Sequence, residues 1–150
     1  MTTVVFSDLS GLAGSDLGTS EWLEITQDRI DRFADATGDH QWIHVDPSRA
    51  ATGPFGTTIA HGYLTLSLVI PLWTDLLRIE DVGMAVNYGL NKVRFPAPVP
   101  VGSKIRLAAT VASVRPVAGN GVELVADLTV EIEGGPKPAA VAQAVYRYHP

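Results

Sequence analysis

The sequence contains no cysteine, which excludes disulfides, thiolate-bound zinc and thiol nucleophiles. It also lacks a run of basic residues, and its formal net charge is −5 at pH 7, so a nucleic-acid partner is not expected. A charged segment followed by an apolar run is missing at the N-terminus, so a secretion signal is not expected. The lack of cysteine fits the reducing cytoplasm, which is the expected location.

Long hydrophobic runs are missing too. The uncharged residues 50–74 contain glycines, prolines and several threonines, so we expect no membrane helix there. The amino-acid composition is typical of a globular protein, with 46% hydrophobic and 18% charged residues. A chain of 150 residues can bury a sizeable core and fits one domain over residues 1–150.

The first third of the chain predicts one helix. Residues 1–20 are rich in Gly and Ser and are expected to be loop-like, and Glu21–Thr26 alternates like a short strand. Thr26 is the expected N-cap of a helix that runs to about Ala36, and Gly38 is expected to end it. Residues 37–58 show no clear period and predict a long irregular segment, a kind of segment that is often functional.

A second helix is predicted from the stretch HGYLTLSLVIPLWTDLL, which starts at His61. Leucines recur every four residues from Leu64 to Leu76, and other apolar residues cover the remaining faces. A helix that is apolar on nearly all sides is expected to be buried, with a kink at Pro71.

The second half alternates with a period of two and predicts antiparallel strands. The expected strands cover residues 86–95, 105–111, 122–132 and 139–148. The phase of the first strand changes near Asn91–Lys92, which indicates a bulge. We therefore predict an α+β fold in which one buried helix is wrapped by an antiparallel meander.

The irregular segment contains TGDHQWIH, in which His40 and His44 have the spacing of the zinc-protease pattern H-E-x-x-H. That pattern needs a Glu to activate water, and Gln41 cannot accept a proton at neutral pH. It also needs one helix, whereas Gly38 precedes the pentapeptide and Pro47 follows it closely. We therefore expect no metal at this site.

Asp39 and His44 suggest a different chemistry, since a carboxylate and an imidazole near one water form an acid–base pair. Spacing alone is also compatible with a structural role, in which Asp39 caps a turn and His44 is a hydrogen-bonded, half-buried histidine. Gly62 opens the apolar helix, where free N–H groups could stabilise an oxyanion. The alternative is that Gly62 only allows tight packing.

Taken together, residues 36–68 resemble the MaoC-like, (R)-specific enoyl-CoA hydratase family, and in particular the branch related to nodulation protein N. The family pattern is matched by Gly38-Asp39, four further residues, His44 and, after five more residues, Ala50. The His-Gly pair at the helix start and NKVRFPAPVPVGS (Asn91–Ser103) also resemble the family, and the similarity covers nearly the whole chain.

The resemblance implies a hot-dog fold, a homodimer, an acyl-CoA thioester substrate and no cofactor. It implies (R)-specific hydration of trans-2-enoyl-CoA, with Asp39 and His44 as the catalytic pair and the Gly62 amide holding the thioester oxygen. Gln41 and Trp42 stand where many members have Asn-Pro, so we expect them to shape substrate binding. We expect His61 to lie near the substrate, in a supporting or structural role like that of His40.

The sequence is also compatible with two other functions. A hot-dog thioesterase would place an acid or a nucleophile on the central helix, but that helix has no carboxylate before Asp75. A non-catalytic acyl-CoA-binding or nodulation-type module would keep the apolar helix and would need neither Asp39 nor His44.

Overall fold

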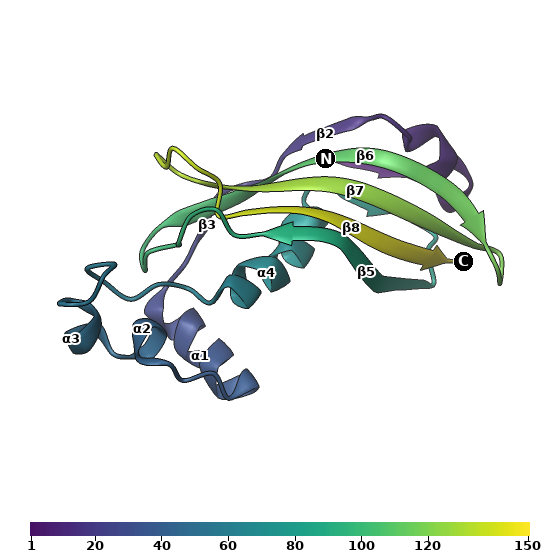
Figure 1. Ribbon diagram of the computed structural model, residues 1–150. Helices are drawn as coiled ribbons and strands as arrows, with labels where there is room; N and C mark the ends of the chain where they lie inside the picture. Colours follow the sequence, from purple (N-terminus) through teal and green to yellow (C-terminus); the bar gives the residue numbers. More distant parts are fainter.

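The computed structural model describes residues 1–150, which form a curved antiparallel sheet around one long helix (Figure 1). The helices are η1 (Phe6–Leu12, a 3-10 helix), α1 (Gln27–Thr37), α2 (Trp42–Val45), α3 (Pro47–Ala50) and α4 (Gly62–Thr74). The strands are β1 (Thr2–Val4), β2 (Asp16–Thr19), β3 (Leu23–Glu24), β4 (Leu77–Ile79), β5 (Met84–Arg94), β6 (Lys104–Val117), β7 (Gly121–Ile132) and β8 (Ala140–His149). None of the helices has the length and apolar character needed to span a lipid bilayer.

The main sheet has the strand order β2-β6-β7-β8-β5, with β3 paired beside β2 on β6. The prediction of a simple meander is therefore wrong for β5, which pairs with β8 instead of β6. The predicted bulge is confirmed, because the β5–β8 register shifts between Leu90 and Lys92. A second shift lies between Asn87 and Gly89.

The core lies between α4 and the concave face of the sheet. Alternate residues of β6 and β7 are buried there, as the period of two predicts, and they pack against the inner face of α4. These core residues include Leu64, Leu68, Leu72, Ile105, Leu107, Val111, Leu124, Leu128 and Val130. Burying one such side chain contributes about 1.5–3 kcal/mol, so this layer supplies most of the stabilisation.

The prediction of a helix buried on nearly all sides is wrong for the outer face of α4. Tyr63 is 72% exposed and Ile70 is 37% exposed. Apolar cavities of about 540 and 240 Å³ lie beside this face, between α4 and β5, and Ile70 lines both. The apolar surface of α4 therefore exceeds what one copy of the sheet covers.

Local signals in the sequence predicted the two ends of α1 correctly. The Thr26 hydroxyl accepts a hydrogen bond from the Arg29 amide at 3.2 Å, which caps the helix. Gly38 adopts φ 80° and ends the helix, because a residue without Cβ tolerates the left-handed conformation. The chain then turns towards the irregular segment that carries Asp39.

Two expectations for short elements were wrong. Residues 1–20 contain β1, η1 and β2, and Glu21–Thr26 forms a strand only at β3. Residues 37–58 contain the short helices α2 and α3; α3 begins at Pro47 and is capped by the Asp46 side chain, which accepts from the Arg49 amide at 3.1 Å. Figure 1 shows α1, α2 and α3 together near the N-terminal end of α4.

Candidate active site

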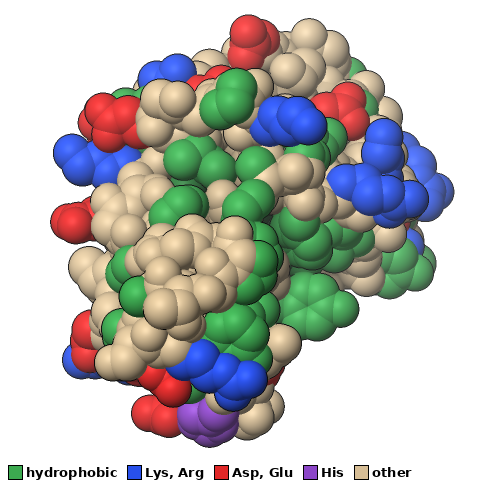
Figure 2. All heavy atoms as spheres, turned by 60° about the vertical axis from the view of Figure 1, so that its left-hand side comes forward, with side chains coloured by type: hydrophobic (Ala, Val, Ile, Leu, Met, Phe, Trp, Pro, Cys, Tyr) green, Lys and Arg blue, Asp and Glu red, His purple; other side chains and the backbone are tan.

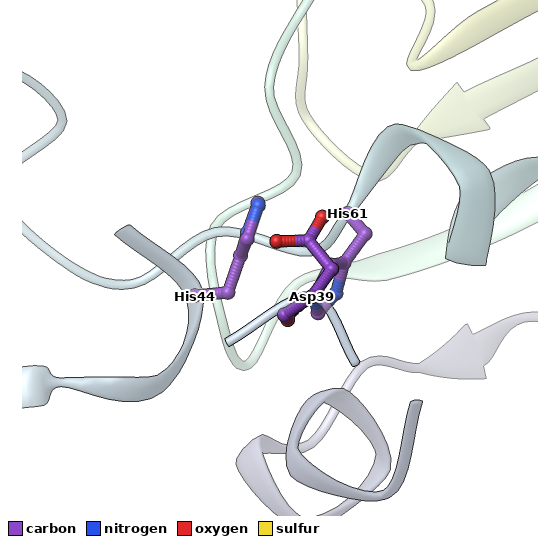
Figure 3. Close-up of side chains that lie close together, drawn as sticks. All are labelled: Asp39, His44 and His61. Carbon is purple, nitrogen blue, oxygen red and sulfur yellow. The ribbon is translucent and has the colours of Figure 1, made fainter. Parts of the chain in front are cut away.

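Three side chains from separate segments converge at the N-terminal end of α4 (Figure 3). Asp39 follows the C-cap of α1, His44 belongs to α2, and His61 is the N-cap of α4. One carboxylate oxygen of Asp39 and one ring nitrogen of each histidine lie within 4.8 Å of one another. The structure therefore brings together the predicted acid–base pair and adds His61 to it.

His44 is anchored in a defined tautomer. Its side chain is only 6% exposed, and Nδ1 lies 2.7 Å from the Ile59 carbonyl oxygen. Because a carbonyl only accepts, Nδ1 carries the proton and Nε2 has a free lone pair in the neutral ring. Burial lowers the pKa of His44 below its usual value of 6.5, against the opposing effect of the Ile59 carbonyl. At neutral pH His44 is thus a neutral ring with an accepting nitrogen.

Gln27 holds the segment around His44, a role that sequence reasoning missed. Its side-chain amide donates to the His44 carbonyl at 2.8 Å and accepts from the Thr58 hydroxyl. The Ile59 amide also donates to the Ile43 carbonyl at 3.0 Å. These bonds join α1, α2 and the segment before α4 into one unit. The only feature of the sequence that could have indicated this role is the position of Gln27 in the first turn of a helix.

Asp39 is exposed, in contrast to both histidines. Its Oδ1 lies 3.4 Å from the Gln41 amide nitrogen, which donates to it, and its backbone carbonyl accepts from His61 Nε2 at 2.9 Å. In Figure 3 the carboxylate points towards the His44 ring. A small molecule between the two groups would therefore meet two acceptors.

A carboxylate and two histidines are also a common set of metal ligands. A metal bound to both rings must lie in the plane of each ring, about 2.0–2.1 Å from the nitrogen for zinc. The His44 and His61 rings are stacked, with centroids 3.8 Å apart and an interplanar angle of 22°. The lone pair of each ring nitrogen lies in the plane of its ring, and these two planes are nearly parallel and offset. The lone pairs therefore do not point to one common position, and the arrangement does not fit a shared metal.

His40, the other histidine of the zinc-protease spacing, lies outside the cluster. Its Nε2 pairs with Asp35 Oδ1 at 2.9 Å on the protein surface. The hydrogen bond that His40 donates to the Asp35 carboxylate raises the pKa of His40 above 6.5. This exposed pair supports a structural role for His40, and the H-E-x-x-H interpretation has no basis in the fold.

Gly62 is the first residue of α4, and its amide N–H has no partner within the protein. It lines a pocket of about 360 Å³ together with His44, Thr65 and Phe95, as well as Phe55, Ile59, Ala60, Ala97, Pro98, Val99 and Ala139. A Cβ at Gly62 would lie 3.2 Å from the Phe95 ring, so packing also favours glycine here. Figure 2 shows hydrophobic side chains exposed at this end of the molecule, with Lys and Arg beside them.

Gln41 and Trp42 do not line this pocket. Gln41 is exposed, and its side chain makes no hydrogen bond within the protein. Trp42 is half-buried under the Arg49 guanidinium, which lies 4.4 Å from the ring centroid, and it packs closely against Gly53. Both side chains therefore lie outside the pocket that His44 and Gly62 line, and the Asp39 side chain does not line it either.

Comparison with known proteins agrees with this arrangement. Residues 8–132 match the family described as the MaoC like domain. The chain belongs to this family, whose members are hydratases and dehydratases. It is 54% identical to 3-hydroxyacyl-thioester dehydratase Z of Mycobacterium tuberculosis over 95% of this chain and 94% of the relative. It is 42% identical to nodulation protein N of Rhizobium meliloti over 100% of this chain and 96% of the relative.

Solved structures show the same fold. The (R)-hydratase from A. caviae superposes with a TM-score of 0.73 at 24% identity, covering 89% of this chain and 94% of the other. An (R)-hydratase from Pseudomonas aeruginosa gives a TM-score of 0.70 at 23% identity, covering 91% and 81%. This MaoC-like chain therefore has the predicted hot-dog fold.

Proposed function

We propose that this protein is an (R)-specific enoyl-CoA hydratase, which adds water to a trans-2-enoyl-CoA to give an (R)-3-hydroxyacyl-CoA. The observation that carries the proposal is the convergence of Asp39 with His44, whose Nε2 accepts and which lines one pocket with Gly62 and its free amide. The (R)-hydratases of the same fold and the similarity to a hydroxyacyl-thioester dehydratase support it.

Hydration needs an oxygen at Cβ and a proton at Cα of the enoyl group. Asp39 and neutral His44 both accept hydrogen bonds, so one water can donate to both and be held above Cβ. As the O–Cβ bond forms, the pair takes one proton from this water and returns a proton to Cα. The carboxylate of Asp39 offsets the charge on His44 if the proton rests there.

Electrons from the double bond move to the thioester oxygen as an enolate during this step. We assign the Gly62 amide as the donor that stabilises this oxygen, because it is unpaired, lines the same pocket as His44 and lies at the positive end of α4. Lys and Arg beside the apolar surface in Figure 2 suit the phosphates of coenzyme A.

We further propose that the protein is a homodimer. Strand β5 is the last strand of the main sheet, and it exposes the large apolar residues Met84, Val86, Tyr88 and Leu90. Open sheet edges are normally paired or covered, and the exposed face of α4 borders the same region. A second copy could cover both surfaces at once.

The proposal extends to substrate binding, cellular location and domain organisation. Gln41 and Trp42 are assigned to substrate binding through the resemblance to the family, and Trp42 with Arg49 would act from beside the pocket. The lack of cysteine supports a cytoplasmic location. Residues 1–150 act as one hydratase domain.

The competing functions are less well supported. A thioesterase would need an acid or nucleophile near the start of α4, whereas the first carboxylate along α4 is the exposed Asp75 at its C-cap. A binding module would not need a buried, tautomer-locked histidine beside a carboxylate.

The deciding experiment offers the purified protein a short trans-2-enoyl-CoA and the matching saturated acyl-CoA. We expect the conjugated enoyl absorbance to fall, the (R)-3-hydroxyacyl-CoA to form, and no thiol to be released from either substrate. Thiol release from the saturated substrate would instead support the thioesterase. Saturable binding without turnover would support the binding module.

A further inference from the structure

His61 has an unusual hydrogen-bonding state. It is only 2% exposed, and its Nδ1 is the one buried side-chain nitrogen or oxygen without a partner. Its Nε2 lies 2.9 Å from the Asp39 carbonyl oxygen, so Nε2 carries the proton and Nδ1 the lone pair.

The ring of His61 contacts two other rings. Phe33 packs against it at an interplanar angle of 56° with centroids 4.9 Å apart, and the His44 ring is stacked on it at 3.8 Å. His61 therefore contacts both members of the proposed catalytic pair, Asp39 through its backbone and His44 through the face of its ring.

We propose that His61 is a positioning residue, which holds the Asp39 backbone and the His44 ring together so that both side chains reach one water. The inference rests on the proposed hydratase function. The hydrogen bond to the Asp39 carbonyl fixes where the chain turns after α1. The stacked ring fixes the orientation of His44 about the axis that its bond to Ile59 leaves free.

This position also makes His61 part of the electrostatic environment of His44. The titratable groups that face His44 are Asp39, which raises its pKa, and His61, which lowers it, while burial is the largest effect and lowers it. Replacing His61 with an uncharged side chain leaves burial and Asp39 in place. We therefore expect the pKa of His44 to rise in such a variant.

Two variants separate the two contacts. His61→Gln places an amide N–H the same number of bonds from Cβ as Nε2, so it can still donate to the Asp39 carbonyl, but it removes the flat ring. His61→Phe keeps a ring against His44 and removes the donor. If His61 only filled space, the His61→Phe variant would retain more activity than the His61→Gln variant.

The test combines kcat and KM against pH on a short enoyl-CoA with histidine ¹⁵N–¹H NMR of the wild-type protein and both variants. We expect His61→Phe to lose about 10²-fold in kcat, as for a misplaced reacting group, with little change in KM. His61→Gln should recover part of that loss, and the His44 pKa should rise in both. In the wild-type spectrum His61 should carry its proton on Nε2.

A His61 proton on Nδ1 in the wild-type protein would overturn the proposal without any variant. So would folded variants that both keep wild-type kcat, or a Phe variant that outperforms Gln with the His44 pKa unchanged. If the wild-type protein shows no hydratase turnover, the proposed function fails separately. The NMR tautomers and the His44 pKa in the variants then still decide whether His61 positions its neighbours.

Discussion

His44 donates a hydrogen bond from Nδ1 to the carbonyl oxygen of Ile59 across 2.7 Å. Ile59 in turn donates its amide to the Ile43 carbonyl at 3.0 Å, so the bond is part of a short ladder between α2 and the segment before α4. The ladder leaves Nε2 of His44 as the free nitrogen. This fixes its role as an acceptor at neutral pH.

The first prediction concerns the pH dependence of kcat/KM, which reports groups in the free enzyme. Because burial lowers the pKa of His44 below 6.5, its neutral form exists above that lowered pKa. We expect kcat/KM to rise with pH through an apparent pKa below 6.5, measured by initial rates on an enoyl-CoA. A rate that instead falls as pH rises through this range would mean that protonated His44 is the active form.

The same shift has a consequence for stability. Between the lowered pKa of folded His44 and 6.5, the unfolded chain binds more protons than the folded one. The contribution of His44 to stability is therefore complete above pH 6.5 and is lost as pH falls through the folded pKa. The urea midpoint of the wild-type protein should drop more steeply in this window than that of His44→Phe, which serves as the control.

The second prediction is that activity survives chelation. The stacked rings of His44 and His61 do not direct their lone pairs to one point, so the cluster does not fit a metal. Prolonged treatment with EDTA should leave kcat unchanged, and added zinc should not increase it. Loss of turnover on chelation, restored by zinc, would show that a metal takes part.

The third prediction separates the amide of Gly62 from its packing. Gly62→Pro removes the N–H, and His61 at φ −58° and ψ 138° has the extended conformation that precedes a proline. Proline is also tolerated at the first helical position. Loss of one oxyanion donor should lower kcat by about 10²–10³-fold.

Gly62→Ala is the matched control, because it keeps the amide and adds a Cβ 3.2 Å from the Phe95 ring. It should lower the thermal midpoint while kcat stays close to that of the wild type. Equal losses of kcat in both variants, or a Pro variant with a lowered midpoint and normal kcat, would assign Gly62 to packing.

The fourth prediction concerns assembly. Light scattering at micromolar concentration should report a dimer, and Leu90→Glu on the exposed β5 surface should shift it towards the monomer. Ser48→Glu on α3 adds the same charge at an exposed position away from β5 and should leave the dimer intact. A wild-type protein that remains a monomer would contradict the proposed dimer.

Local sequence signals predicted the parts of this fold that depend on near neighbours. Thr26 and Gly38 mark the ends of α1, and alternation predicted β6 and β7. The pairing of β5 with β8, and the short strands within residues 1–20, depend on partners far along the chain. No local pattern could indicate them.

The candidate active site also has features that the sequence predicted and features that depend on packing. The spacing of Asp39 and His44 predicted a pair, and the structure brings their side chains together. The contact of His61 with both residues, and the bonds of Gln27 across three segments, arise only when α1, α2 and α4 pack. The substrate-binding roles expected for Gln41 and Trp42 stay predictions; neither side chain lines the pocket, and that of Asp39 does not line it either.

The central claim is that Asp39 and His44 act on one water, and a double-mutant cycle on enoyl-CoA hydration tests it most directly. Asp39→Asn and His44→Ala should each remove most of kcat while the proteins stay folded. Because the two groups act as a unit, the double variant should be hardly slower than the slower single variant. A double variant slowed by the full product of the two single losses would contradict a shared water.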